Sequence, residues 1–163
     1  MADTKHTLVA LVEDKPGVLT RVASLFRRRA FNIQSLAVGH SEKPGLSRMT
    51  VVVNGDSAVV EQVRKQLDKL INVLKAFDIT DEDIVARELA LIKVRATAST
   101  RSEIIQIVDI FRANIVDVAS DSLTVEVTGD EDKVESLLKL LRSFGIKEAT
   151  RTGRVALTRG DAQ

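Results

Sequence analysis

The sequence contains no cysteine and only two histidines among its 163 residues. A chain without cysteine has no thiolate nucleophile, disulfide, iron–sulfur cluster or Cys-rich zinc site. The two histidines, His6 and His40, lie far apart, with no Cys or carboxylates at metal-ligand spacing. We therefore expect no metal site in this chain, and a reducing cytoplasm as its location.

Aromatic residues and long apolar runs are also scarce. Tryptophan and tyrosine are absent, and five phenylalanines leave little material for a base-stacking surface. The 24 Lys and Arg residues nearly balance 23 Asp and Glu, which argues against broad neutralisation of nucleic-acid phosphates. The longest apolar run, residues 8–12, is far short of the ~20 residues that a membrane helix needs. We expect neither nucleic acid nor membrane as a partner.

The clearest positive feature is an internal repeat. The string MTVVVNGD at residues 49–56 recurs as LTVEVTGD at residues 123–130. Around each copy, the hydrophobic periodicity predicts the element order βαββαβ. In the first half we expect strands at 7–13, 32–38, 48–54 and 72–79, and helices at 16–30 and 57–70. The apolar stripe that we expect the first helix to bury consists of Val18, Leu19, Val22, Leu25 and Phe26. In the second half we expect strands at 88–96, 115–119, 123–128 and 146–151 with 155–158, and helices at 101–113 and 130–144.

This order predicts an α+β fold of two ferredoxin-like units in tandem, each a four-stranded antiparallel sheet with both helices on one face. The acidic stretch at residues 78–83 marks the boundary, giving domains 1–80 and 81–163. A unit of roughly 75 to 80 residues is marginally stable alone. We therefore expect a homodimer, joined through edge strands or over the open sheet faces.

The segment EDKPGVL at residues 13–19 carries the most suggestive chemistry, because a strand end runs directly into a helix there. Pro16 suits the first helical turn. The amides of Gly17, Val18 and Leu19 would then be donors at the helix N-terminus, where a carboxylate or phosphate can bind. Beside them, the carboxylate of Asp14 could accept an ammonium group, so the loop fits a free amino acid. The alternative is that Asp14 only caps the helix.

Several strings resemble one known family. The patterns DxPGVLxRVxxLF at 14–26, FNIxSL at 31–36, LSRMT at 46–50 and QLxKL at 66–70 resemble the N-terminal ACT domain of the small, regulatory subunit of acetolactate synthase (acetohydroxyacid synthase). The patterns RELxLIKV at 87–94 and FRAxIVDV at 111–118 resemble the C-terminal domain of that subunit. The resemblance spans essentially the whole chain.

The resemblance implies a non-catalytic partner of a thiamine-diphosphate enzyme in valine, leucine and isoleucine biosynthesis. In this family the small subunit activates the catalytic subunit and confers feedback inhibition by valine. Thiamine diphosphate, Mg and FAD are expected only on the catalytic subunit, and no cofactor is expected on this chain. The alternative is a free-standing ACT-domain amino-acid sensor, or an ACT regulator of another enzyme.

The resemblance also implies where valine binds. In the family the inhibitor lies where two ACT domains meet, between the strand-to-helix loop of one chain and the start of the second strand of the other. On the matching positions here, the loop consists of Asp14, Gly17, Val18 and Leu19, and the other wall of Asn32 and Ile33. Asp14 keeps an acceptor where relatives can carry Asn, which leaves the preferred amino acid open.

Each of three surface features has two possible interpretations. Arg48 is our candidate contact with the catalytic subunit, although a cross-strand ion pair explains it equally well. The run of arginines at residues 27–29 is either a solvated helix end or a contact with an acidic partner. The loop at residues 39–46, which the second half lacks, is either a hairpin tip or a docking loop.

Overall fold

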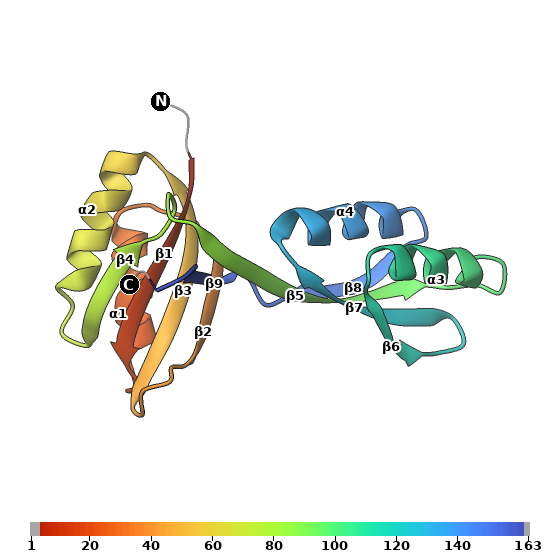
Figure 1. Ribbon diagram of the computed structural model, residues 1–163, viewed down its shortest axis with the longest axis horizontal. Coiled ribbons are helices and arrows are strands. Elements are labelled where there is room, and N and C mark those ends of the chain that lie inside the picture. The colour runs from red at the N-terminus through yellow and green to blue at the C-terminus, as the bar shows by residue number, and fades with distance from the viewer. Residues whose placement is uncertain (1–3, 162–163) are drawn as a thin grey trace. The chain divides into compact units, whose positions relative to one another are not determined.

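The computed structural model describes residues 4–161 and forms two compact units (Figure 1). Residues 4–85 and 154–161 belong to the first unit, and residues 86–153 to the second. The C-terminal segment of the chain thus groups with the first unit. The ranges 1–80 and 81–163 remain a prediction about which parts fold independently.

The first unit has the expected βαββαβ order. Its strands are β1 (Thr4–Glu13), β2 (Ile33–His40), β3 (Leu46–Gly55) and β4 (Val73–Asp78), and its helices are α1 (Val18–Arg28) and α2 (Ser57–Asp68). The antiparallel sheet has the order β2-β3-β1-β4, so β2 and β4 are its edges. Both helices lie on one side of it, as Figure 1 shows. Alternate residues of β1, namely Leu8, Ala10 and Val12, pack with both helices in one core.

The second unit repeats this plan. Its strands are β5 (Ile84–Arg95), β6 (Asn114–Val118), β7 (Ser122–Gly129) and β8 (Ile146–Arg151), and its helices are α3 (Arg101–Ile110) and α4 (Glu131–Arg142). The strand order is β6-β7-β5-β8, and β9 (Val155–Thr158) also pairs with β5. The expected α+β fold of two ferredoxin-like units is therefore confirmed, with one strand more than the expected four in the second sheet.

The repeated Gly-Asp string marks the same junction in both units. Asp56 Oδ1 accepts a hydrogen bond from the Ala58 amide at 2.9 Å, and Asp130 Oδ1 accepts one from the Lys133 amide at 2.9 Å. Each aspartate is thus the N-cap of the following helix, α2 or α4. The string recurs because the same strand-to-helix turn needs a side-chain acceptor in both units.

Residues of β1 and β3 are also buried on the sheet face away from the helices. Thr7, Val9, Thr50 and Val52 are each at most 3 % exposed, although their neighbours in sequence point into the helix-covered core. Arg154 Nη1 donates to Thr7 Oγ1 at 2.9 Å, which places Arg154, just before β9, on this face. The chain's own C-terminal segment thus covers part of the face that we expected a second chain to cover.

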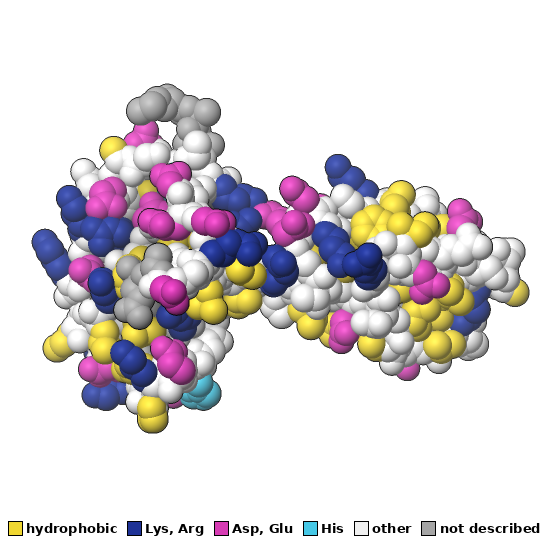
Figure 2. Space-filling model, viewed as in Figure 1, with side chains coloured by type: hydrophobic (Ala, Val, Ile, Leu, Met, Phe, Trp, Pro, Cys, Tyr) yellow, Lys and Arg dark blue, Asp and Glu magenta, His cyan; other side chains and the backbone are white. Residues whose placement is uncertain are grey.

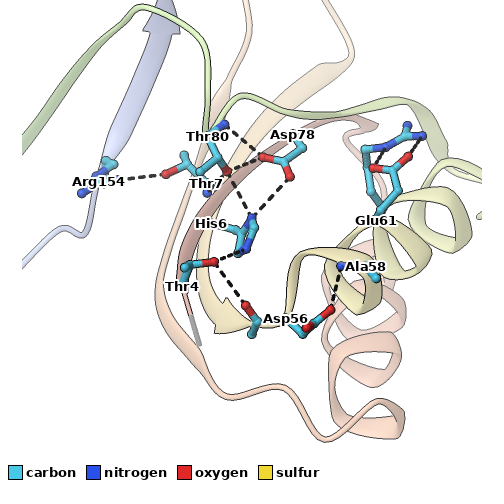
Figure 3. A network of polar contacts seen from close by, with 11 residues as sticks. Thr4, His6, Thr7, Asp56, Ala58, Glu61, Asp78, Thr80 and Arg154 are labelled. Atoms are coloured by element: carbon cyan, nitrogen blue, oxygen red, sulfur yellow. Dashed lines mark hydrogen bonds and ion pairs between the residues drawn. The ribbon is translucent and has the colours of Figure 1, made fainter. Parts of the chain in front are cut away.

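A partly buried polar network joins the start of β1 to the segment after β4 (Figure 3). His6 is 5 % exposed; its Nε2 lies 2.8 Å from Thr4 Oγ1 and its Nδ1 lies 3.5 Å from Asp78 Oδ2. Thr80 Oγ1 donates to Asp78 Oδ1 and accepts from the Thr7 amide at 3.1 Å. The network therefore holds the segment that leaves the first unit against its central strand.

The ends of all four helices differ from the sequence-based ranges; the fourth helix runs from Glu131 to Arg142 rather than over residues 130–144. The first begins at Val18 rather than at residue 16, because Gly17 has a left-handed φ of 86° that no helical residue adopts. The second ends at Asp68, and Leu70 packs against the core from the turn beyond it. The third ends at Ile110, since Arg112 has a φ of 53°. Charged side chains of both signs are interspersed over the face drawn in Figure 2.

Candidate functional site

The candidate site is built on the turn between β1 and α1. The strand ends at Glu13, and the chain turns through residues 14–17 before the helix begins at Val18. Gly17 makes this turn possible, because its φ of 86° is a conformation that other residues rarely adopt. A Cβ at Gly17 would meet no atom within 4 Å, so open space lies next to the backbone there. We had expected Pro16 in the first turn of the helix. It lies instead in the turn that precedes the helix.

No side chain caps α1, unlike α2 and α4. The alternative reading of Asp14 as the helix cap is therefore wrong. One of the three expected donors is partly engaged, because the Val18 amide donates a long hydrogen bond of 3.4 Å to the Lys15 carbonyl. The N-terminal end of α1 keeps the partial positive charge that attracts an anion, and no acidic residue lies in its first turn.

Asp14 contacts the hairpin between β2 and β3. Its amide donates to the Gly45 carbonyl at 2.9 Å, and its Oδ2 lies 3.2 Å from His40 Nδ1. Both side chains are well exposed, at 48 % for Asp14 and 82 % for His40. The acceptor proposed for an ammonium group is therefore accessible, and it already has one cationic competitor when His40 is protonated.

The two apolar residues of the loop lie in different environments. Val18 is 4 % exposed and belongs to the core, whereas Leu19 is 48 % exposed. We expected Leu19 on the buried stripe of the helix, and this is wrong: Val18, Val22, Leu25 and Phe26 are the buried residues of α1, and Leu19 lies at the exposed edge of their stripe. Leu19 is therefore accessible to a ligand at this turn, whereas Val18 is not.

Asn32 and Ile33 lie at the opposite end of the same sheet. Glu13 pairs with Leu46 at one end of β3, whereas Ile33 pairs with Val53 near the other end. The strand rises about 3.3 Å per residue, so these two ends are about 23 Å apart. Asn32 is exposed and Ile33 packs partly against the core. One chain therefore does not bring the two expected walls of the site together.

Arg48 lies on β3 beside Leu11 on one neighbouring strand and Gly39 on the other. Neither neighbour is charged, and no carboxylate within residues 4–161 forms an ion pair with Arg48. The alternative reading as a cross-strand ion pair is therefore not found in the described part of the chain.

Asn72, in the segment before β4, makes hydrogen bonds to residues on both sides of the same turn. Its Nδ2 donates to Glu13 Oε2 at 3.1 Å, its Oδ1 accepts from Arg21 Nη1, and its carbonyl accepts from the Glu13 amide at 2.8 Å. Lys15 Nζ lies 2.9 Å from Glu13 Oε2. The hydrogen bonds from Lys15 and Asn72 lower the pKa of Glu13. The turn is thus held in place by polar contacts from Lys15 and from the segment before β4.

Sequence reasoning missed His40 and Asn72 as parts of this site. Each lies more than twenty residues from the loop along the chain, and nothing in the periodicity links them to it. The strand pairing is what brings both near, because β2 ends and β4 begins beside the C-terminal end of β1.

Within residues 4–161, no helix is long and apolar enough to span a membrane.

Comparisons with known proteins identify the family. Residues 8–75 match the model of the AHAS small subunit-like ACT domain, and residues 87–160 match the model of the small subunit of acetolactate synthase. The chain is 60 % identical over 157 residues to a probable acetolactate synthase small subunit of Archaeoglobus fulgidus, covering 96 % of this chain and 98 % of that one. It is 56 % identical over 160 residues to the acetolactate synthase small subunit of Mycobacterium bovis, covering 98 % and 95 %.

The fold agrees with the same assignment. The crystal structure of the acetolactate synthase small subunit from Thermotoga maritima matches with a TM-score of 0.89 at 44 % sequence identity, over 98 % of this chain and 99 % of that one. The matches extend over both units, so they concern the whole chain and not one domain. The chain belongs to the family of acetolactate synthase small subunits.

Proposed function

We propose that this chain activates the catalytic subunit of acetolactate synthase and makes that enzyme sensitive to feedback inhibition by valine. Family membership supports a regulatory role beside a catalytic subunit. Valine, activation and the place in branched-chain amino-acid synthesis are our inference from the family resemblance and the site. The observation that carries this proposal is the uncapped turn at Gly17 with an exposed carboxylate, Asp14, beside it.

The chemistry of the turn fits the two charges of a free amino acid. Backbone amides at the start of α1 would receive the α-carboxylate, because a helix N-terminus attracts an anion. Asp14 would receive the α-ammonium group through a charge-assisted hydrogen bond. Leu19, half-exposed next to these groups, would contact the isopropyl side chain.

The second wall of the pocket comes from another copy of the chain. Asn32 and Ile33 are about 23 Å of strand away from the turn in their own chain, by the rise of about 3.3 Å per residue. They can face the turn of a partner, however, in a twofold dimer. Asn32 has both a donor and an acceptor for the zwitterion, and Ile33 adds apolar surface.

The size of valine limits how tightly it can bind. With about eight heavy atoms at no more than ~1.5 kcal/mol each, the ceiling is about 12 kcal/mol. The cost of ordering the ligand and two chains reduces this, so we expect micromolar to submillimolar dissociation constants. Inhibition also requires that valine binds two arrangements of the dimer with different affinity, because equal affinity would transmit nothing.

The direct test replaces Gly17 in the reconstituted holoenzyme. Gly17→Asp places a carboxylate where the carboxylate of valine belongs, and we expect it to abolish valine inhibition while activation of the catalytic subunit persists. Gly17→Asn is the matched control, because asparagine has the same shape, tolerates the left-handed φ equally well and carries no charge. We expect Gly17→Asn to retain part of the inhibition.

The same assay decides between this proposal and its alternatives. Unchanged valine inhibition in Gly17→Asp would show that valine binds elsewhere. A chain that binds valine but neither associates with nor activates the catalytic subunit would be the free-standing sensor or a regulator of another enzyme. The absence of a cofactor and of a metal on this chain, and its cytoplasmic location, stay predictions.

A further inference from the structure

The outer surface of α1 is strongly basic. The helix contains Arg21, Arg27 and Arg28 and no acidic residue, and Arg29 follows as its C-cap. The side chains at positions 27 to 29 are all exposed. The whole chain has a net charge of only +1, so this concentration of positive charge is local.

These arginines lack carboxylate partners within residues 4–161. Arg29 Nε donates to the neutral amide oxygen of Gln66 at 3.4 Å, and no ion pair involves Arg27 or Arg28 there. By contrast, Arg64 pairs with Glu61 and Arg151 pairs with Glu88. The guanidinium groups of Arg27 and Arg28 therefore remain available to an external acceptor.

The second unit shows that the helix end does not require arginines. Ala30 and Arg112 both have a positive φ, of 57° and 53°, and each is followed two residues later by an Asn-Ile pair. The two turns are therefore equivalent, and Asp109 and Ile110 occupy the positions of Arg27 and Arg28. The last turn of α3 contains no basic residue. The last turns of α2 and α4 do contain basic residues, so stabilisation of the helix end accounts for part of the positive charge of α1. Three consecutive arginines are more than either of those helix ends carries.

We infer that Arg27, Arg28 and Arg29 form a docking surface for an acidic patch on the catalytic subunit. This inference rests on the proposed function, since it names the surface through which the regulatory chain holds its partner. Arginine suits such a contact, because its planar guanidinium binds carboxylates with two parallel hydrogen bonds and is enriched at interfaces. A protein partner fits better than a nucleic acid, because the chain has almost no net charge and few aromatic residues.

The test titrates the full-length chain into the catalytic subunit and follows acetolactate formation at low and high salt. The variant Arg27→Gln/Arg28→Gln removes two charges from the last turn of α1. We expect its apparent affinity at low salt to fall about five- to tenfold, because exposed charge pairs contribute modestly and mainly steer association. We also expect a weaker salt dependence than for the wild type, and the same maximal activation at saturation.

Two further variants separate charge from folding. Lys139→Gln/Arg142→Gln removes the same two charges from the last turn of α4, and we expect its affinity to stay within about twofold of the wild type. Arg27→Lys/Arg28→Lys keeps the charge, and we expect most of the affinity to return. Sedimentation of each variant alone is expected to give the wild-type oligomeric state.

Four outcomes of these experiments would contradict the docking surface or the proposed function. Wild-type affinity and salt dependence in Arg27→Gln/Arg28→Gln would overturn the docking surface, and so would an equal loss in the α4 variant. A change of oligomeric state would assign the surface to contacts between copies of this chain instead. Binding of a DNA duplex that depends on these arginines, without an effect on the catalytic subunit, would also overturn it. If the wild type itself fails to bind or activate the catalytic subunit, the proposed function fails first.

Discussion

His40 Nδ1 lies 3.2 Å from Asp14 Oδ2, so a residue of the β2–β3 hairpin engages the carboxylate that we assign to the ammonium group of the effector. The hairpin lies beside the turn because β2 ends where β1 ends in the sheet. The two groups compete for Asp14, since a protonated histidine and an ammonium group are both cationic donors.

His40→Ala is therefore expected to strengthen the response to valine. With Asp14 released, the half-inhibitory valine concentration falls about two- to fivefold, the range of an exposed ion pair. Lys43→Ala, which removes a charge from the same hairpin, is the control and leaves that concentration unchanged. An increased half-inhibitory concentration in His40→Ala would show that His40 assists binding and does not compete with it.

The two glycines of the repeated Gly-Asp string differ in their surroundings. A Cβ at Gly55 would lie 2.2 Å from Cε1 of the Phe31 ring, whereas at Gly129 it would lie 2.5 Å from Cδ of the flexible Lys133 side chain. We expect Gly55→Ala to lower the free energy of unfolding by about 1–3 kcal/mol, because the ring must move within a packed region. Gly129→Ala is expected to change it by less than about 1 kcal/mol, because Lys133 can adopt another rotamer. Urea unfolding measures the free energy of unfolding of both variants. Equal effects would contradict the close approach of Gly55 to the Phe31 ring.

The ionisation of Glu13, next to the candidate site, affects the stability of the folded chain at acidic pH. Its pKa is lowered from 4.5 by hydrogen bonds from Lys15 and Asn72. The folded state therefore gains stability from this carboxylate above about pH 4.5, and loses it as pH falls through the lower folded pKa. In Glu13→Gln we expect the free energy of unfolding to depend less steeply on pH below 4.5 than in the wild type. An unchanged slope in thermal melts between pH 5 and pH 3 would contradict the role of these hydrogen bonds.

The second unit depends on a partly buried ion pair. Glu88 is 7 % exposed, and its Oε1 accepts a hydrogen bond from Arg151 Nε at 3.0 Å; Arg151 also binds Glu135. Arg151→Ala leaves a buried carboxylate without its partner, which we expect to cost about 3–5 kcal/mol of unfolding free energy. Lys93→Ala, which breaks the exposed pair with Glu148, is the control at about 0–1 kcal/mol. Chemical denaturation distinguishes the two, and a similar small effect in both would contradict the importance of the buried pair.

The sequence predicted the strands and helices well because apolar periodicity is a local signal. The stripe of Val22, Leu25 and Phe26 does face the core, as expected. The start of α1 was misplaced by two residues because a glycine's left-handed conformation leaves no trace in periodicity. The contacts of His40 with Asp14, and of Arg154 with Thr7, were not predictable, since they join segments that only the strand order brings together.

The residues of the candidate site also divide into local and non-local features. Asp14 and Gly17 were identified from the chemistry of a helix N-terminus, which is again local. The separation of Asn32 from that turn follows from the element order, because α1 returns the chain to the opposite end of the sheet before β2 begins. Because of that separation, the proposed valine site needs two chains, and this is the central claim of the proposal.

Complementation between two inactive variants tests this claim most directly. Gly17→Asp damages the turn and Asn32→Ala damages the opposite wall, so neither homodimer is expected to bind valine well. In a heterodimer of the two, one site combines an intact turn with an intact Asn32, and the other site is damaged twice. Calorimetry on the purified heterodimer is therefore expected to show one valine site per two chains. No binding in the heterodimer would show that valine does not bind between the turn of one chain and Asn32 of the other, and would contradict the account.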